Sequence, residues 1–117
     1  MENQLIDINN IKIASNLLNT IVKKTPLHFN GRLSDSNNCS VWLKREDLQE
    51  VRSFKIRGAF NKIYSLKNTE RKKGVVCSSA GNHAQGFAKS CKELKIKGTV
   101  FMPTITPKQK IEQVKMF

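Results

Sequence analysis

The fold is decided by the stretch Gly74-Val75-Val76-Cys77-Ser78-Ser79-Ala80-Gly81, which runs directly into a helical pattern over residues 82–95. The apolar run predicts a buried strand, and the small residues after it predict a turn. One face of the expected helix is apolar, since it carries Ala84, Phe87, Ala88, Cys91 and Leu94. A buried strand that leads through a tight turn into an amphipathic helix is typical of α/β domains with a parallel sheet.

The same order of strand and helix recurs on both sides of this stretch. Residues 41–43 (Val-Trp-Leu) predict a strand, and residues 54–66 return to helical spacing. Residues 99–102 predict a third strand, and residues 108–117 predict the start of another helix. We therefore expect three strands in one parallel sheet, joined by right-handed crossovers.

The rest of the chain is assigned from residues that end helices or favour loops. Residues 10–23 predict an amphipathic helix that ends before Thr25-Pro26, because a residue before proline avoids helical geometry. Residues 34–38 are polar and predict a loop, as does the basic run over residues 71–73. Three strands make a thin sheet, and Phe117 falls within a helical pattern. We expect an incomplete three-layer α/β domain.

Composition excludes several classes of protein. The hydrophobic share is 38% and the charged share 26%, as in ordinary globular chains. No apolar run approaches the length of a membrane helix, and no secretory signal is visible, so we expect a cytoplasmic protein without membrane association. Three widely spaced cysteines and two histidines predict reduced thiols and no metal site.

The net charge of +12 leaves nucleic-acid binding as a low-ranked alternative. The excess comes from residues 51–117, which hold fifteen Lys/Arg and three Asp/Glu. These basic residues are scattered over faces that a helix would turn to water, and no aromatic residues alternate with them as stacking platforms. A solvated basic surface is the favoured interpretation, with no nucleic-acid partner.

Two loops are expected at the carboxyl edge of the sheet, where open parallel sheets bind ligands. One spans residues 44–55 and the other residues 78–83, and each opens a helix whose free N–H groups favour an anion. For the second loop, spacing alone leaves an ordinary cap by Ser79 or Asn82 and a ligand site equally open. For the first, a solvent-facing Lys55 is the default interpretation.

Taken together, the two loops resemble a known family. Lys44-Arg45-Glu46-Asp47-Leu48-Gln49 with Ser53-Phe54-Lys55-Ile56-Arg57-Gly58-Ala59 resembles the cofactor-lysine signature of the serine/threonine dehydratases. Ser79-Ala80-Gly81-Asn82-His83-Ala84-Gln85-Gly86 resembles their second motif, at the expected separation. Shorter matches lie at residues 24–27, 102–103 and 107–108, so the resemblance runs from about Ile11 to Phe117.

The resemblance implies a fold and a cofactor. These enzymes are similar to the β subunit of tryptophan synthase (fold type II), with pyridoxal 5′-phosphate (PLP) between two α/β domains. By that resemblance, residues 1–45 are the N-terminal helix and first strand, and residues 46–117 are part of the small domain. The implied site residues are Lys55, which binds the cofactor covalently; Phe54, beside it; Asn82, on its ring hydroxyl; and Ser79, Gly81, Asn82 and His83, around the substrate carboxylate.

The implied reaction is β-elimination from L-threonine, which gives 2-oxobutanoate and ammonia, as in isoleucine biosynthesis or threonine catabolism. Burial at a helix N-terminus would favour the free amine of Lys55 as nucleophile and base. Racemases of this group resemble Ser-Ser-Gly-Asn-His, with a serine acid/base where this chain has Ala80. Dehydration without racemisation is therefore favoured, with a serine dehydratase or racemase as the alternative. Overall similarity of the motifs favours threonine over serine.

The family also needs a glycine-rich loop for the PLP phosphate and a polar partner for the pyridine nitrogen, and the sequence contains neither. We therefore interpret the chain as the N-terminal part of a longer enzyme, a homodimer or homotetramer by family habit, and expect these 117 residues alone to be inactive. A non-catalytic truncated remnant remains an alternative.

Overall fold

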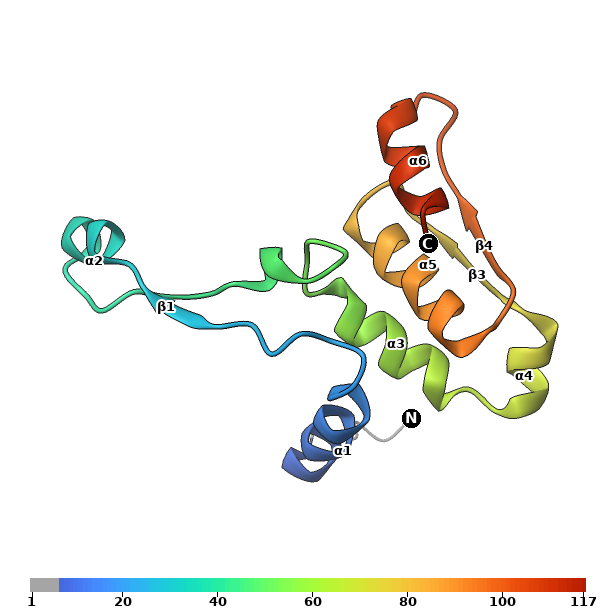
Figure 1. Cartoon of the computed structure of the whole chain (residues 1–117), viewed down its shortest axis with the longest axis horizontal. Helices are drawn as coiled ribbons and strands as arrows, with labels where there is room; N and C mark the ends of the chain where they lie inside the picture. Colours follow the sequence, from blue (N-terminus) through green and yellow to red (C-terminus); the bar gives the residue numbers. More distant parts are fainter. Residues whose placement is uncertain (1–6) are drawn as a thin grey trace.

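The computed structural model describes residues 7–117, which form a body of helices and strands and a projecting arm (Figure 1). The chain measures 51 × 39 × 30 Å, and its radius of gyration is 16.9 Å. Such a radius is larger than the roughly 13 Å of a compact domain of this length, because the arm stands away from the body. The elements in order are α1 (Ile8–Leu18), β1 (Leu27–Phe29), α2 (Gly31–Asn37), β2 (Trp42–Lys44), the 3₁₀ turn η1 (Glu46–Leu48), α3 (Lys55–Ser65), α4 (Asn68–Lys73), β3 (Val75–Ser78), α5 (Asn82–Leu94), β4 (Gly98–Phe101) and α6 (Lys108–Lys115).

The body is built on the parallel pair β3 and β4, with Val75 opposite Gly98 and Ser78 opposite Phe101. Helix α5 crosses over between the two strands and packs on both of them and along α3. The core forms where these elements meet, at Ile63, Phe87 and Cys91, all at least 94% buried. The strand and helix expected over residues 75–95 are therefore confirmed as β3 and α5. The pairing of β3 with β4 is parallel, as predicted.

Only one face of this small sheet is covered by the described residues. Val75, Cys77 and Val100 pack against the core cluster. On the opposite face Val76 is 70% exposed and Phe101 60% exposed. The alternation follows from strand geometry, because successive side chains point to opposite faces.

The arm contains an antiparallel ribbon, in which Leu27 pairs with Lys44 and Phe29 with Trp42. The rings of Phe29 and Trp42 meet edge to face, 5.4 Å apart, and every residue of both strands is exposed. The prediction that the strand at residues 41–43 joins the parallel sheet is therefore wrong. A three-residue apolar run does not specify its partner, and the partner strand at Leu27–Phe29 was not predicted.

Two segments predicted as loops are short helices. Helix α2 begins after Asn30, whose side chain accepts a hydrogen bond from the Leu33 amide at 2.9 Å. It ends at Asn37, and the next residue, Asn38, is in a left-handed conformation with φ 48°. Helix α4 is supported by Glu70, whose carboxylate accepts from the Lys67 amide at 2.7 Å. In α2 the small polar residues serve caps as readily as turns. In α4 the basic residues 71–73 form the last turn of the helix, where positive charge is favourable.

The remaining helices agree with the sequence interpretation at their cores and differ at their ends. Helix α1 stops at Leu18, earlier than the predicted residue 23, and residues 19–22 continue as turns. Helix α3 spans Lys55–Ser65 with Ile56, Phe60 and Ile63 buried, as the helical spacing predicted. No helix among residues 7–117 has the length and apolar character needed to cross a membrane.

Candidate active site

Lys55 is the first residue of α3, at the end of a loop that begins at Arg45. The helix has no side-chain cap at its start, and the Lys55 amide donates only a long bond of 3.4 Å to Ser53 Oγ. The Lys55 Nζ lies 5.1 Å from the centre of the Phe54 ring, and within the described residues it forms no ion pair. The amine is thus available, beside an aromatic ring.

The burial expected for Lys55 is not found, because its side chain and that of Phe54 are both exposed in the described part of the chain. The loop that leads to them is nevertheless firmly packed. Val51 is 1% exposed and Ser53 is 7% exposed. The loop therefore presents Lys55 outward from a buried base.

An ion pair fastens this loop to the first turn of α3. The Glu46 carboxylate accepts two hydrogen bonds of 2.8 Å from the Arg57 guanidinium and one of 2.6 Å from Thr25 Oγ1. The Gln49 side-chain amide donates a hydrogen bond of 3.3 Å to the same carboxylate. It also donates to the Lys23 carbonyl, and its oxygen accepts from the Lys23 amide. The Arg57 partner is the main reason that the pKa of Glu46 falls to about 2. Since Arg57 lies two residues after Lys55, this pair fixes the start of α3.

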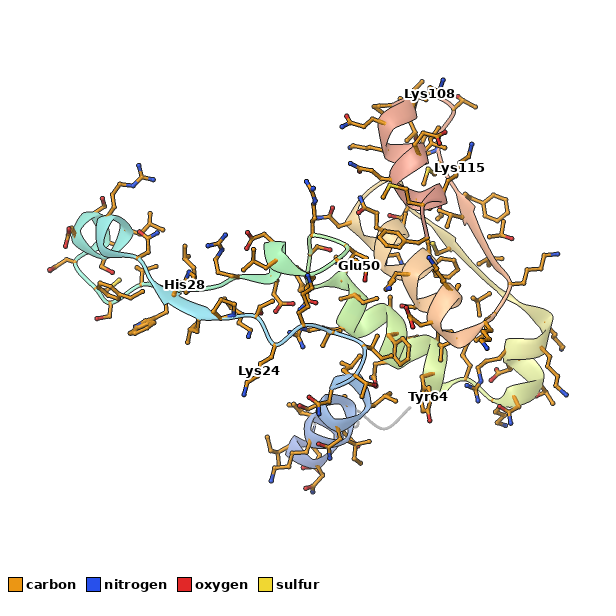
Figure 2. All side chains as sticks on the ribbon, viewed as in Figure 1. Lys24, His28, Glu50, Tyr64, Lys108 and Lys115 are labelled. Carbon is orange, nitrogen blue, oxygen red and sulfur yellow. The ribbon has the colours of Figure 1, made fainter. Side chains whose placement is uncertain are left out.

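A second ion pair ties the same loop to α5. Lys89 Nζ lies 2.8 Å from Glu50 and 2.7 Å from Glu93, and the Lys89 side chain is only 13% exposed. Figure 2 shows Glu50 on the loop between the arm and α5. The loop is held by α3 on one side and by α5 on the other.

The second predicted loop joins β3 to α5. The Ser79 amide donates to the Phe101 carbonyl at 3.0 Å, and Ser79 Oγ accepts from the Gly81 amide at 3.3 Å. Gly81 is the residue before α5, and no side chain caps the helix. The alternative in which Ser79 or Asn82 caps α5 is therefore wrong, and Asn82 and His83 lie exposed at the helix start.

Packing of α3 against α5 brings the two loops together. Phe54, Lys55 and His83 line one cavity of about 530 Å³, whose apolar wall includes Ile63, Cys77 and Phe87. Figure 1 shows both helices starting from the same end of the body. The reason given from the sequence, a shared sheet edge, is wrong, because β2 is not in the sheet of β3.

One contributor to this arrangement was missed by sequence reasoning. Gly86, in the second turn of α5, faces the backbone of Lys55, and a Cβ built on it would lie 2.9 Å from the Lys55 carbonyl carbon. A glycine inside a helical pattern is the sequence signal that could have found it. It joins the predicted residues as part of the same contact between helices.

The cysteines and histidines of residues 7–117 are not grouped with one another or with carboxylates as a set of metal ligands would be. Among residues 7–117 no group of three or more His, Cys, Asp or Glu side chains is placed to hold an ion. His28 lies on the arm, away from the body (Figure 2). Burial raises the pKa of Cys91 to about 11 and raises that of Cys77 as well. Both cysteines therefore hold thiols that resist ionisation.

The comparisons with known proteins agree on one family. Residues 18–117 match the family model described as pyridoxal-phosphate dependent enzyme. The biosynthetic L-threonine dehydratase of Halalkalibacterium halodurans is 57% identical over 112 residues, which are 96% of this chain and 27% of that enzyme. The chain thus spans about a quarter of the length of the curated relatives it matches.

Solved structures agree with this assignment. Serine racemase from Dictyostelium discoideum superposes with a TM-score of 0.87 and 33% identity, over 95% of this chain and 36% of the racemase. Threonine deaminase isoform 2 from Solanum lycopersicum gives 0.79 and 37%, over 95% of this chain and 32% of that structure. These likenesses confirm the predicted α/β fold class.

Proposed function

Because this chain belongs to the pyridoxal-phosphate-dependent enzyme family, we propose that it supplies the lysine side of a threonine dehydratase active site. The observation that carries the proposal is that Lys55 and His83, from two separate motifs, line one cavity. The relatives named biosynthetic L-threonine dehydratase, at 50–60% identity, support L-threonine as substrate and 2-oxobutanoate and ammonia as products. In this proposal residues 46–117 form part of the small domain.

The residues of this chain fit the part of PLP that carries its aldehyde group. The amine of Lys55 is free of ion pairs among the described residues, and Lys55 lines a cavity of the size that small ligands occupy. Phe54 offers an aromatic face beside it, and Asn82 would hydrogen-bond the ring hydroxyl. When bound, PLP supplies an electron sink for the carbanion formed at the substrate Cα.

Lys55 has two tasks in this proposal. Its amine would hold the cofactor, and the same amine would serve as the base for the Cα proton of the substrate. Fixation of the first turn of α3 by Glu46 and Arg57 keeps this amine in place. With the Cα proton removed and a proton supplied to its oxygen, the substrate β-hydroxyl would leave as water. Addition of water to the resulting enamine would then give 2-oxobutanoate and ammonia.

The loop before α5 would hold the substrate carboxylate. Ser79, Gly81, Asn82 and His83 surround the uncapped helix start, where free amides and the helix dipole favour an anion. A Cβ on Gly81 would meet nothing within 4 Å, so its missing side chain leaves room for a ligand. Such a site fixes the orientation of the substrate relative to Lys55.

A racemase of serine is the second candidate, favoured by the TM-score of 0.87 with serine racemase. Ala80 argues against it, because the methyl side chain cannot deliver a proton to the opposite face of the substrate. Chiral analysis after incubation with L-serine separates the two: a racemase forms D-serine, whereas a dehydratase forms the 2-oxo acid.

The proposed function is tested by turnover of L-threonine in the protein expressed from its complete gene and supplied with PLP. We expect formation of 2-oxobutanoate and its loss in Lys55→Ala, with Lys72→Ala as the control, since Lys72 is an exposed lysine of α4 outside this cavity. The 117 residues as a separate polypeptide should give no robust turnover, since they lack the phosphate loop that the family resemblance implies. Turnover that survives Lys55→Ala contradicts the proposal.

A further inference from the structure

Gly86 lies in the interior of α5 and contacts the backbone of α3 at Lys55. A Cβ built on it would be 2.9 Å from the Lys55 carbonyl carbon, 3.0 Å from the Ile56 nitrogen and 3.1 Å from the Lys55 oxygen. These atoms belong to one peptide group, which has no flexible end that could move aside. The two helices therefore approach each other at this point more closely than any larger residue would permit.

Glycine at this position has an intrinsic cost, since it destabilises a helix interior by about 1 kcal/mol relative to alanine. The surrounding residues are packed to hold the contact. Ala84 and Ser90 are each 0% exposed, and Ser90 Oγ donates a hydrogen bond of 2.6 Å to the Gly86 carbonyl. Close packing of the helices thus gives the physical reason for a glycine here.

We propose that Gly86 is a positioning residue, which sets the distance between the Lys55 amine and the carboxylate-binding loop that begins α5. The inference rests on the proposed function of Lys55 and of residues 79–83. Gly86 lies four residues after Asn82, or about 6 Å along the helix axis, and it contacts the peptide of Lys55 itself. A change in this one contact therefore displaces both halves of the site relative to each other.

The displacement can be bounded from the structure. Ordinary van der Waals contact of a Cβ begins at 3.4 Å, so an alanine at position 86 must move the helices apart by about 0.5 Å or more from the present 2.9 Å. A misplacement of about 1 Å at reacting groups can lower a rate about 100-fold. We expect Gly86→Ala to lower kcat about 10- to 100-fold, with a smaller change in KM.

Two other glycines provide matched controls. A Cβ on Gly98 would lie 2.6 Å from Cys91 Sγ and 3.0 Å from a Phe87 ring carbon, so Gly98→Ala also crowds α5, but at its contact with β4 and not at the Lys55 peptide. A Cβ on Gly31 in α2 would meet only a Phe29 ring carbon, at 3.9 Å. Gly98→Ala reproduces the strain, and Gly31→Ala reproduces the substitution without strain.

The experiment compares the three variants in the PLP-loaded protein expressed from its complete gene. The measurements are kcat and KM for L-threonine, the yield of borohydride-fixed cofactor on Lys55, and hydrogen exchange of residues 53–60. We expect only Gly86→Ala to lower kcat and the yield on Lys55 and to speed exchange in that segment. Normal kcat and yield in folded Gly86→Ala, or the same losses in Gly98→Ala, overturn the inference.

A measurement on the unaltered protein covers the case in which Gly86→Ala does not fold. Under rising urea, residues 53–60 and 82–90 should lose exchange protection together, because the contact at Gly86 joins them in one cooperative unit. Independent opening of the two segments contradicts the inference. An absence of turnover and of cofactor on Lys55 in the unaltered protein would instead refute the proposed function, while exchange still decides whether Gly86 couples the helices.

Discussion

Replacement of Glu46 by glutamine removes the charge that fixes the first turn of α3 while keeping the shape of the side chain. In the folded protein the carboxylate faces Arg57 and Thr25 and is 14% exposed, and Arg57 is 35% exposed. These partners lower the pKa of Glu46 from 4.5 to about 2. By linkage a shift of this size corresponds to at most about 3 kcal/mol, and solvent at Arg57 reduces this to roughly 2 kcal/mol.

The sign of the pH dependence follows from the lowered pKa. Well above pH 4.5 the carboxylate is ionised in both the folded and the unfolded state, and the folded protein has the full benefit of the pair. As pH falls from 4.5 towards 2, the unfolded chain binds a proton before the folded one, and this stabilisation is lost. The difference between the parent and Glu46→Gln should therefore be largest at neutral pH, small near pH 2 and absent below it.

Urea unfolding of both proteins at several pH values measures this difference. Asp47→Asn is the matched control, since Asp47 pairs with Arg45 on the surface, where the two side chains are 57% and 36% exposed. We expect its loss of stability to be far smaller. A loss in Glu46→Gln that is the same at neutral pH and near pH 2 would show that the ionised pair is not its source.

Three further predictions concern the site and the core. Gly81→Ala should leave stability unchanged, because the new Cβ would meet nothing within 4 Å and the φ of −122° suits any residue. The same change should raise KM for L-threonine, and an unchanged KM would argue against a carboxylate site there. At pH 7 iodoacetamide should modify the exposed Cys39 first, because burial raises the pKa of Cys77 and of Cys91, the latter to about 11; peptide mapping that finds Cys91 modified fastest contradicts this. Phe87→Ala should lower the free energy of unfolding by about 3–5 kcal/mol, measured in urea, because Phe87 is 4% exposed within the core; a loss near zero would mean that this core does not hold the body together.

The body could be predicted from the sequence because its signals are local. Residues 82–95 carry a complete apolar face, and residues 75–77 form an uninterrupted apolar run, so their helix and strand follow from side-chain spacing alone. The parallel pairing of β3 and β4 follows because α5 supplies the crossover between them. Each of these features is decided within about 30 residues of chain.

The arm and the contact between the two loops could not be predicted in this way. The pairing of Leu27–Phe29 with Trp42–Lys44 depends on tertiary contact, and both strands are too short to show a period. Proximity of Lys55 to His83 was expected for an incorrect reason, since it comes from packing of α3 on α5 rather than from one sheet. Gly86 determines how closely α3 and α5 pack. The sequence does not show which residue a single glycine contacts.

The assignment of Lys55 is tested most directly by borohydride reduction of the PLP-loaded protein expressed from its complete gene, followed by peptide mapping. Reduction converts the covalent link between the cofactor and its lysine into a stable bond. The expected result is one modified peptide, with the label on Lys55. A label on another lysine, such as Lys62 in the same cavity, with Lys55 unmodified, would contradict the assignment of Lys55 as the lysine that binds the cofactor.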